Sequence, residues 1–264
     1  MTNNYEFTSF ELIPNVRIYQ GLLPDVDELY NIMKKSETDA EGKYYLTPWI
    51  KWGPYGTTAH QKHEGQEEIG DDPRAKEEKY LSDRVFEAYR TALEDYKKTY
   101  NFDFPETVSL LKSSFSKYDG SIEGGSNGLV MHYHTDFIIS ERDLPGQKFL
   151  LTCTTYINDD YDGGEIEFYV EDEVESKFYP YKPKAGDVLI FPSQEPYWHG
   201  VKNIKHGHKY FVRNYLTYYY DGHPDWIANQ KMHGAYRWAK MEIERVDREN
   251  ISKIHMKHVE RKLK

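Results

Sequence analysis

The sequence has 264 residues but only one cysteine, Cys153, so no disulfide bond can form within the chain. It also lacks an apolar run long enough to cross a membrane, and its N-terminus does not show a basic segment followed by an apolar one, as a secretory signal would. These absences favour a soluble protein of the reducing cytoplasm that has no membrane partner.

Basic residues are outnumbered as well. The chain has 34 Lys and Arg against 44 Asp and Glu, which gives a formal net charge of -10. Nucleic-acid-binding surfaces usually carry a basic patch, so this function class is disfavoured. The one basic cluster, residues 252–264, is typical of a solvated helix end.

Aromatic residues, by contrast, are abundant: they make up 16% of the chain, and 24 of them are Tyr. This content fits a β-rich fold, because aromatic side chains pack well on pleated surfaces. We find no internal repeat, low-complexity tract or long flexible linker. A single domain, 1–264, is therefore expected.

The N-terminal part predicts two helices. After an expected strand at 13–23, Pro24 opens a helix, and a second helix is expected at roughly 74–100. Their apolar residues fall at helical spacing: Val26, Leu29, Tyr30 and Met33 in the first, and Leu81, Val85, Tyr89, Leu93 and Tyr96 in the second. Residues 43–65 lie between them and are rich in aromatics, Gly and Pro, which is too irregular for a core element.

From residue 107 the pattern changes to short strands separated by turn signals. The expected strands are 108–118, 129–137, 148–157, 165–171, 176–182, 187–192, 197–202 and 208–219. About eight strands at this spacing indicate an α+β protein with a jelly-roll, or double-stranded β-helix, core. We expect helical support at 1–105, the jelly-roll core at 106–220 and a C-terminal helix at 224–264.

The stretch MHYHTDFIIS at 131–140 holds the first functional signal. A strand would place His132, His134 and Asp136 on one face. Two imidazoles and a carboxylate that are half buried together are costly unless something pairs with them. A metal ion and a buried hydrogen-bond network are the two alternatives, and this stretch by itself does not decide between them.

A third metal-ligand candidate, His199, follows in FPSQEPYWHGVKN. Two histidines and one carboxylate leave three coordination positions open, which is the arrangement of non-haem Fe(II) oxygenases. A structural zinc site would instead need a closed set that usually includes cysteines. A second His-x-Asp, at His223 and Asp225, lies in a Pro-containing turn and is interpreted as a helix start.

Lys209 extends this pattern. If 203–208 form a turn, Lys209 begins the next strand and points into the same cavity. A buried ammonium needs an anionic partner, and a dicarboxylate that chelates iron at its other end would provide it. Arg213 has the same strand parity, so it is an alternative carboxylate partner or a contact to the prime substrate.

Five motifs in order give the chain a resemblance to the Fe(II)/2-oxoglutarate-dependent dioxygenases, in particular their prolyl 4-hydroxylase-like branch. The resemblance covers roughly 110–215 and extends more loosely to the N-terminal helices. The motifs are His-x-Asp, then TCTTYIND, DGGEIEFY, KPKAGDVLIFPS and the run from His199 to Val201, Gly207, Lys209 and Tyr210.

The resemblance implies the following roles. His134, Asp136 and His199 would ligate Fe(II), and Lys209 would bind the distal carboxylate of 2-oxoglutarate. Tyr156 and Thr152 would hydrogen-bond the co-substrate. Tyr118 resembles a family tyrosine on the neighbouring strand, although SIEGGSNG lengthens the connection here. His132 is an alternative ligand if the register slips, and a supporting or core role is preferred for it.

The activity that the resemblance implies is hydroxylation of a C–H bond with Fe(II), 2-oxoglutarate and O2, releasing succinate and CO2; ascorbate is left open as an accessory cofactor. By analogy the substrate is a prolyl residue in a peptide or protein. The alternatives are a free amino acid or other small metabolite and, in another class, a non-catalytic jelly-roll binding module.

Segment 43–65, with Trp49, Trp52 and Tyr55, is a candidate substrate lid or a packed surface loop. The pattern does not predict the oligomeric state.

Overall fold

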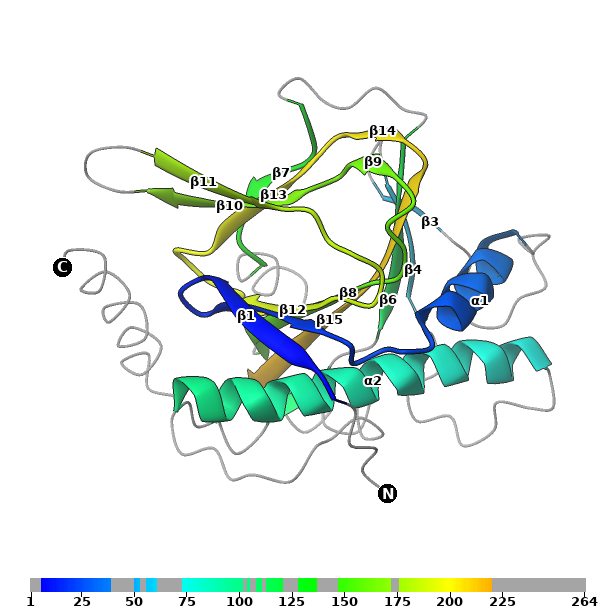
Figure 1. Ribbon diagram of the computed structural model, residues 1–264, viewed down its shortest axis with the longest axis horizontal. Coiled ribbons are helices and arrows are strands. Elements are labelled where there is room, and N and C mark those ends of the chain that lie inside the picture. The colour runs from blue at the N-terminus through cyan, green and yellow to red at the C-terminus, as the bar shows by residue number, and fades with distance from the viewer. Residues whose placement is uncertain are drawn as a thin grey trace.

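The computed structural model describes residues 6–38, 50–52, 56–60, 73–101, 104, 108–110, 113–120, 128–136, 147–171 and 176–219. In this part of the chain, two antiparallel sheets face each other and two helices lie on the outer side of the larger sheet (Figure 1). The predicted α+β class with a jelly-roll core agrees with this architecture.

The larger sheet has nine strands, and each hydrogen-bonded neighbour runs antiparallel to the next. Its order is β1 (Thr8–Ile13), β2 (Val16–Gln20), β12 (Val188–Pro192), β8 (Gln147–Tyr156), β15 (His208–Tyr219), β6 (Ser114–Asp119), β4 (Gly56–His60) and β3 (Ile50–Trp52), and β5 (Val108–Leu110) also pairs with β15. The strand expected at 13–23 is thus the second arm of a hairpin, and the strand expected at 108–118 is divided into β5 and β6.

The smaller sheet has the order β11 (Ser176–Tyr181), β10 (Ile166–Glu171), β13 (Trp198–Lys202) and β7 (Leu129–His134). A two-stranded sheet of β14 (Ile204–His206) and β9 (Asp162–Gly163) adjoins the turn that leads to β15. The two main sheets meet through aromatic rings: Phe168 on β10 contacts Phe191 on β12 edge to face, with 5.1 Å between ring centroids.

Helices α1 (Val26–Thr38) and α2 (Pro73–Tyr100) cover the outer face of the larger sheet. The predicted stripe on α2 is confirmed, because its members are all at most 3% exposed: Leu81, Val85, Tyr89, Leu93 and Tyr96. Arg84 of α2 binds Asp25, just before α1, through two hydrogen bonds of 2.7 and 3.0 Å. This forked pair fixes the start of α1 against α2.

The alternation of β15 shows how the fold builds a site. Val212 and Leu216 are fully buried in the core that the helices share. Lys209, Phe211 and Arg213 have the opposite parity and line a cavity between the two sheets. Because side chains of a strand point alternately to its two faces, one strand supports the helix layer and the cavity at once.

Several expectations change or lie outside the described residues. Segment 43–65 was expected to be too irregular for a core element; its described parts form β3 and β4, which extend the larger sheet at its edge, where β4 pairs with β6 and β3 pairs with β4. The helical support at 1–105 therefore also contributes β1 to β4. The lid residues Trp49 and Tyr55 and the expected helix 224–264 lie outside the described residues.

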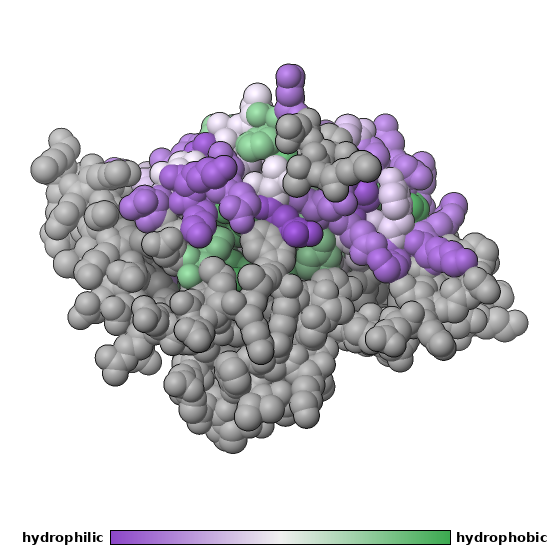
Figure 2. All heavy atoms as spheres, turned by 90° about the horizontal axis from the view of Figure 1, so that it is seen from below, coloured by the Kyte–Doolittle hydropathy of each residue, from purple (hydrophilic) through white to green (hydrophobic). Residues whose placement is uncertain are grey.

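On the face shown in Figure 2, seen from the side of α2, the described surface is mainly hydrophilic, with small hydrophobic areas between the polar side chains. Neither described helix is long and apolar enough to span a lipid bilayer. The single-domain boundary 1–264 stays a prediction.

Candidate metal centre and co-substrate pocket

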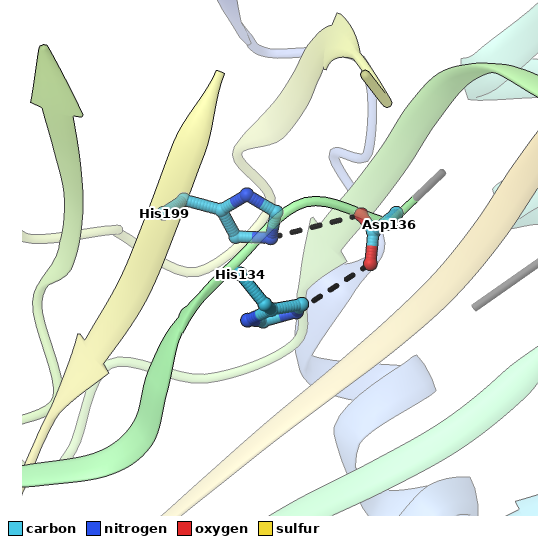
Figure 3. A group of neighbouring side chains, drawn as sticks. All are labelled: His134, Asp136 and His199. Carbon is cyan, nitrogen blue, oxygen red and sulfur yellow. Dashed lines mark ion pairs between the residues drawn. The ribbon is translucent and has the colours of Figure 1, made fainter. Parts of the chain in front are cut away.

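Three predicted ligands come together between the sheets. His134 ends β7, Asp136 follows two residues later, and His199 lies on β13 directly opposite His134 in the antiparallel register. Their ligand atoms all lie within 4.8 Å of one another. In Figure 3 both imidazole rings point toward the Asp136 carboxylate. Pairing of β7 with β13 thus joins residues that are far apart in the sequence.

Backbone carbonyls fix the orientation of both rings. Nδ1 of His134 lies 2.8 Å from the carbonyl oxygen of His132, and Nδ1 of His199 lies 3.1 Å from that of Tyr197. A carbonyl oxygen only accepts, so each Nδ1 must donate its hydrogen. In the neutral rings the two Nε2 atoms then carry lone pairs, and they face Asp136 at 3.5 and 3.6 Å. This supporting geometry is typical of metal-binding histidines.

Asp136 is held rigidly. Its side chain is 1% exposed, Thr152 donates to Oδ2 at 2.6 Å, and the Tyr215 hydroxyl donates to Oδ1 at 3.2 Å. Burial by itself would raise the pKa of Asp136, but the neighbouring His199 and His134 hold that pKa below its ordinary value. The carboxylate is therefore ionised at neutral pH.

His199 is in the form that a metal requires. Burial, together with the charge of His134, lowers the pKa of His199 to about 4, although Asp136 opposes this. Its ring is enclosed by Phe191 and Phe168, with centroid distances of 4.7 and 5.8 Å. Neutral imidazoles whose lone pairs face an ionised carboxylate repel it unless a cation lies between them. This donor set fits Fe(II), which two histidines and one carboxylate bind with open positions.

The cavity beside these residues has a volume of about 410 Å³, which includes the part that is open to solvent. It is lined by residues of both sheets: Tyr118, Met131, His134, Asp136, Thr152, Thr154, Tyr156, Ile166, Phe191, His199, Val201, Lys209, Phe211 and Arg213. All seven predicted site residues are in this set. The fold therefore brings them to one place, while their individual roles stay predictions.

Lys209 lines the cavity and is only 1% exposed. Its Nζ donates to the Gly164 carbonyl at 2.5 Å and lies 4.8 Å from the centre of the Tyr156 ring. Burial, with a contribution from Lys182, lowers the pKa of Lys209 to about 7. A carboxylate that entered the cavity would supply the charge partner that this ammonium needs.

The Gly164 carbonyl, which accepts the hydrogen bond from Lys209, lies in a turn that requires glycine. Gly163 and Gly164 have φ angles of 74° and 69°, and a Cβ at Gly164 would lie 2.3 Å from a methyl group of Ile204. These two glycines therefore allow a turn that a residue with a side chain would not permit.

Sequence reasoning missed the structural role of Asn158. Its side-chain amide donates to the His208 carbonyl at 2.7 Å and accepts from the Tyr210 backbone N–H at 2.7 Å. These two bonds flank Lys209 and fix the start of β15 against the end of β8. The signal was available, because Asn158 is part of the motif TYIND.

Thr152 was predicted to hydrogen-bond the co-substrate, and this role stays a prediction. In the structure its hydroxyl contacts Asp136 and Ser193, at 2.6 and 2.9 Å. Tyr118 and Tyr156 line the cavity as predicted, and Tyr118 pairs with Lys209 across β6 and β15. Burial raises the pKa of Tyr118 to about 12, so its hydroxyl stays protonated.

Three other histidines of the described residues are outside the ligand group. His132 is exposed, so a core role for its side chain is wrong, although its carbonyl orients His134. His206 and His208 are exposed. His223 and Asp225 lie outside the described residues.

Comparison with known proteins agrees with this site. Residues 115–221 match the model of the 2OG-Fe(II) oxygenase superfamily. That region holds all three candidate iron ligands and Lys209, so the similarity to this superfamily covers the whole candidate site. No curated protein sequence matches the chain.

Solved structures are similar in fold. A prolyl hydroxylase from Trichoplax adhaerens, in complex with a peptide fragment of the hypoxia inducible factor oxygen degradation domain, is 16% identical; the match covers 77% of this chain and 83% of that one, with a TM-score of 0.51. A prolyl-4-hydroxylase from Pseudomonas putida is 15% identical, with 81% and 92% covered and a TM-score of 0.44.

Proposed function

We propose that the protein is an Fe(II)- and 2-oxoglutarate-dependent dioxygenase that hydroxylates a prolyl residue in a peptide or protein and releases succinate and CO2. The observation that carries the oxygenase chemistry is the presence of His134, Asp136, His199 and Lys209 in one cavity. Bound Fe(II) would supply the redox chemistry that couples O2 to oxidation of 2-oxoglutarate.

The chain's own residues would prepare the site for that chemistry. His134, Asp136 and His199 hold the metal, and Thr152 keeps the Asp136 carboxylate in place through a 2.6 Å hydrogen bond. Lys209 pairs with the distal carboxylate of 2-oxoglutarate and is protonated when that anion binds. Phe168 and Phe191 keep water away from the His199 ring.

The peptide substrate is supported by the Trichoplax adhaerens prolyl hydroxylase, which shares the fold and holds a peptide fragment. A free amino acid or other small metabolite is the second candidate, and its carboxylate could pair with Arg213, which adds a second cation to the cavity lining. Cytoplasmic localisation and a role for ascorbate stay predictions.

Succinate formation tests the proposal. The purified protein should convert 2-oxoglutarate to succinate only with both Fe(II) and O2, and a proline-containing peptide should increase the rate more than the same peptide with alanine at that position. Stimulation by free L-proline instead would favour the second candidate. No succinate from folded, iron-loaded protein would favour a non-catalytic binding module.

A further inference from the structure

Arg213 is a second cation in the cavity that the proposed chemistry does not use. It lies on β15 with the same parity as Lys209, and roughly 13 Å of strand separate the two Cα atoms at about 3.3 Å per residue. A five-carbon dicarboxylate is no longer than two residues of extended chain, roughly 7 Å. A co-substrate whose distal carboxylate pairs with Lys209 would have its other carboxylate at the metal, which leaves no carboxylate of that molecule for Arg213.

The Arg213 guanidinium has no direct anionic contact among the described residues, although the Asp136 carboxylate acts on it from a longer distance. Among the described residues Arg213 forms no ion pair with Asp136 or any other carboxylate, and its buried Nε has no hydrogen-bond partner. Its one aromatic contact there is with Tyr215, whose ring centre lies 5.3 Å from Cζ. A partly buried guanidinium without an anion is costly, so the arrangement indicates a ligand that brings one.

Charge balance indicates which ligand this is. With Fe(II) bound, the cavity would contain a dication and two side-chain cations, and Asp136 alone among the described lining residues carries a carboxyl group. The two carboxylates of 2-oxoglutarate leave one positive charge unmatched. An anionic group on the prime substrate would complete the balance.

Lys209 and Arg213 also differ in solvent exposure. Lys209 is sealed at 1% exposure, as suits a co-substrate that enters first and is enclosed. The Arg213 side chain is partly exposed, so a molecule arriving later at the mouth can still reach it. We propose that Arg213 binds a carboxylate of the prime substrate, an inference that rests on the oxygenase function proposed above.

A guanidinium fork binds a carboxylate through two parallel hydrogen bonds, which would orient the neighbouring C–H bonds toward the metal. The carboxylate has two sources: the α-carboxylate of a free amino acid, or an acidic side chain or C-terminus of a peptide. Both present the same chemistry to Arg213.

The test uses the intact protein without O2. Fe(II) and 2-oxoglutarate are added, and the visible charge-transfer band and the melting temperature are followed as probes are titrated. The probes are free L-amino acids against their carboxamides, and proline-containing peptides with an acidic residue or free C-terminus against their amidated, uncharged counterparts. The two probe sets separate the two sources.

The variants are Arg213→Gln, Arg213→Lys and, as a matched loss of charge outside the cavity, Lys205→Gln, which changes an exposed residue of β14. We expect at least one carboxylate probe to bind about 10–100-fold more tightly than its amide, because charge-assisted hydrogen bonds have this strength. Arg213→Gln should abolish this preference, Arg213→Lys should retain part of it, and Lys205→Gln should leave it unchanged.

Two results would overturn the inference. One is that no carboxylate probe binds better than its amide, or that Arg213→Gln keeps the preference. The other is that Arg213→Gln weakens 2-oxoglutarate binding about tenfold or more, which would assign Arg213 to the co-substrate. Absence of the charge-transfer band in the unmodified protein would instead refute the proposed oxygenase function.

Discussion

The two faces of the larger sheet use the same strands for different purposes. On the helix side, Cys153 of β8 and Val212 of β15 are fully buried in a mainly apolar layer. On the cavity side, the neighbouring Thr152 and Arg213 carry polar groups aimed at the candidate site. One residue of displacement along a strand separates a packing role from a chemical one.

Because residues of opposite strand parity face the helix layer and the cavity, substitutions that affect stability should be separable from those that affect function. The helix layer gains free energy from close apolar packing, whereas the cavity holds buried polar groups that cost free energy unless paired. Substitutions on the helix side should therefore change the free energy of unfolding, and those on the cavity side should change ligand binding. Each prediction below tests this separation.

The largest effect is expected from His199→Ala. Removing one of three ligands should abolish the charge-transfer band of the anaerobic Fe(II)–2-oxoglutarate complex, while far-ultraviolet circular dichroism shows the apoprotein still folded. His132→Ala is the matched control, because His132 is exposed, lies beside His134 on β7 and is outside the ligand group. Loss of the band in this control as well would contradict the assignment of ligands.

The helix side is tested by Leu216→Ala. Leu216 is fully buried in the layer that α1 and α2 share, so its truncation should lower the free energy of unfolding by about 2–5 kcal/mol in urea denaturation. The affinity of the folded protein for 2-oxoglutarate should not change. Phe10→Ala, which truncates an exposed side chain, should cost far less stability. A large loss of 2-oxoglutarate affinity in Leu216→Ala would show that the two layers are coupled.

The next largest effect is expected from Lys209→Met, which changes a residue on the cavity side of the sheet. Loss of the charge partner should raise the dissociation constant of 2-oxoglutarate about 10–100-fold in anaerobic titrations. 2-Oxobutanoate or another 2-oxo acid that lacks the distal carboxylate should bind both forms about equally. An unchanged dissociation constant would leave Arg213 as the partner of that carboxylate.

Lys209 should also make the stability of the folded apoprotein depend on pH. Burial lowers the pKa of Lys209 from 10.5 to about 7, so between these pH values the unfolded chain binds a proton that the folded apoprotein does not. Folding stability of the apoprotein should therefore rise with pH across this window, and Lys209→Met should remove that part of the rise. Urea denaturation at several pH values between 7 and 9.5 measures it, and an identical slope in the variant would contradict the pKa shift.

Much of the site follows from the sequence because strand parity is simple. His134 and Asp136 share a face at a spacing of two, and motif order places His199 and Lys209 on later strands of the same core. Parity within one strand is not sufficient, however, because β7 ends at His134 before Asp136, and His132, which has the same parity, is exposed. The strand pairing in the structure brings all four to the cavity.

What the sequence did not predict depends on partners that lie elsewhere in the chain. Strands β3 and β4 have no alternating pattern of their own; β4 pairs with β6, and β3 pairs with β4. The contact of Thr152 with Asp136 depends on a side-chain rotamer and on how β8 lies against the end of β7. Local periodicity contains neither piece of information.

The smallest effect is expected from Thr152→Val, which removes one hydroxyl while keeping the side-chain shape. Asp136 would lose its 2.6 Å hydrogen bond to Thr152 but keep the one from Tyr215. Supporting hydrogen bonds of this kind contribute about 10–100-fold to metal affinity, and with one bond left we expect about tenfold weaker Mn(II) binding by electron paramagnetic resonance. Thr152→Ser should restore the affinity, and Thr154→Val, on the same face of β8, should change it less. If Thr152→Val instead weakened 2-oxoglutarate binding with unchanged metal affinity, the hydroxyl would serve the co-substrate, as the sequence alone predicts.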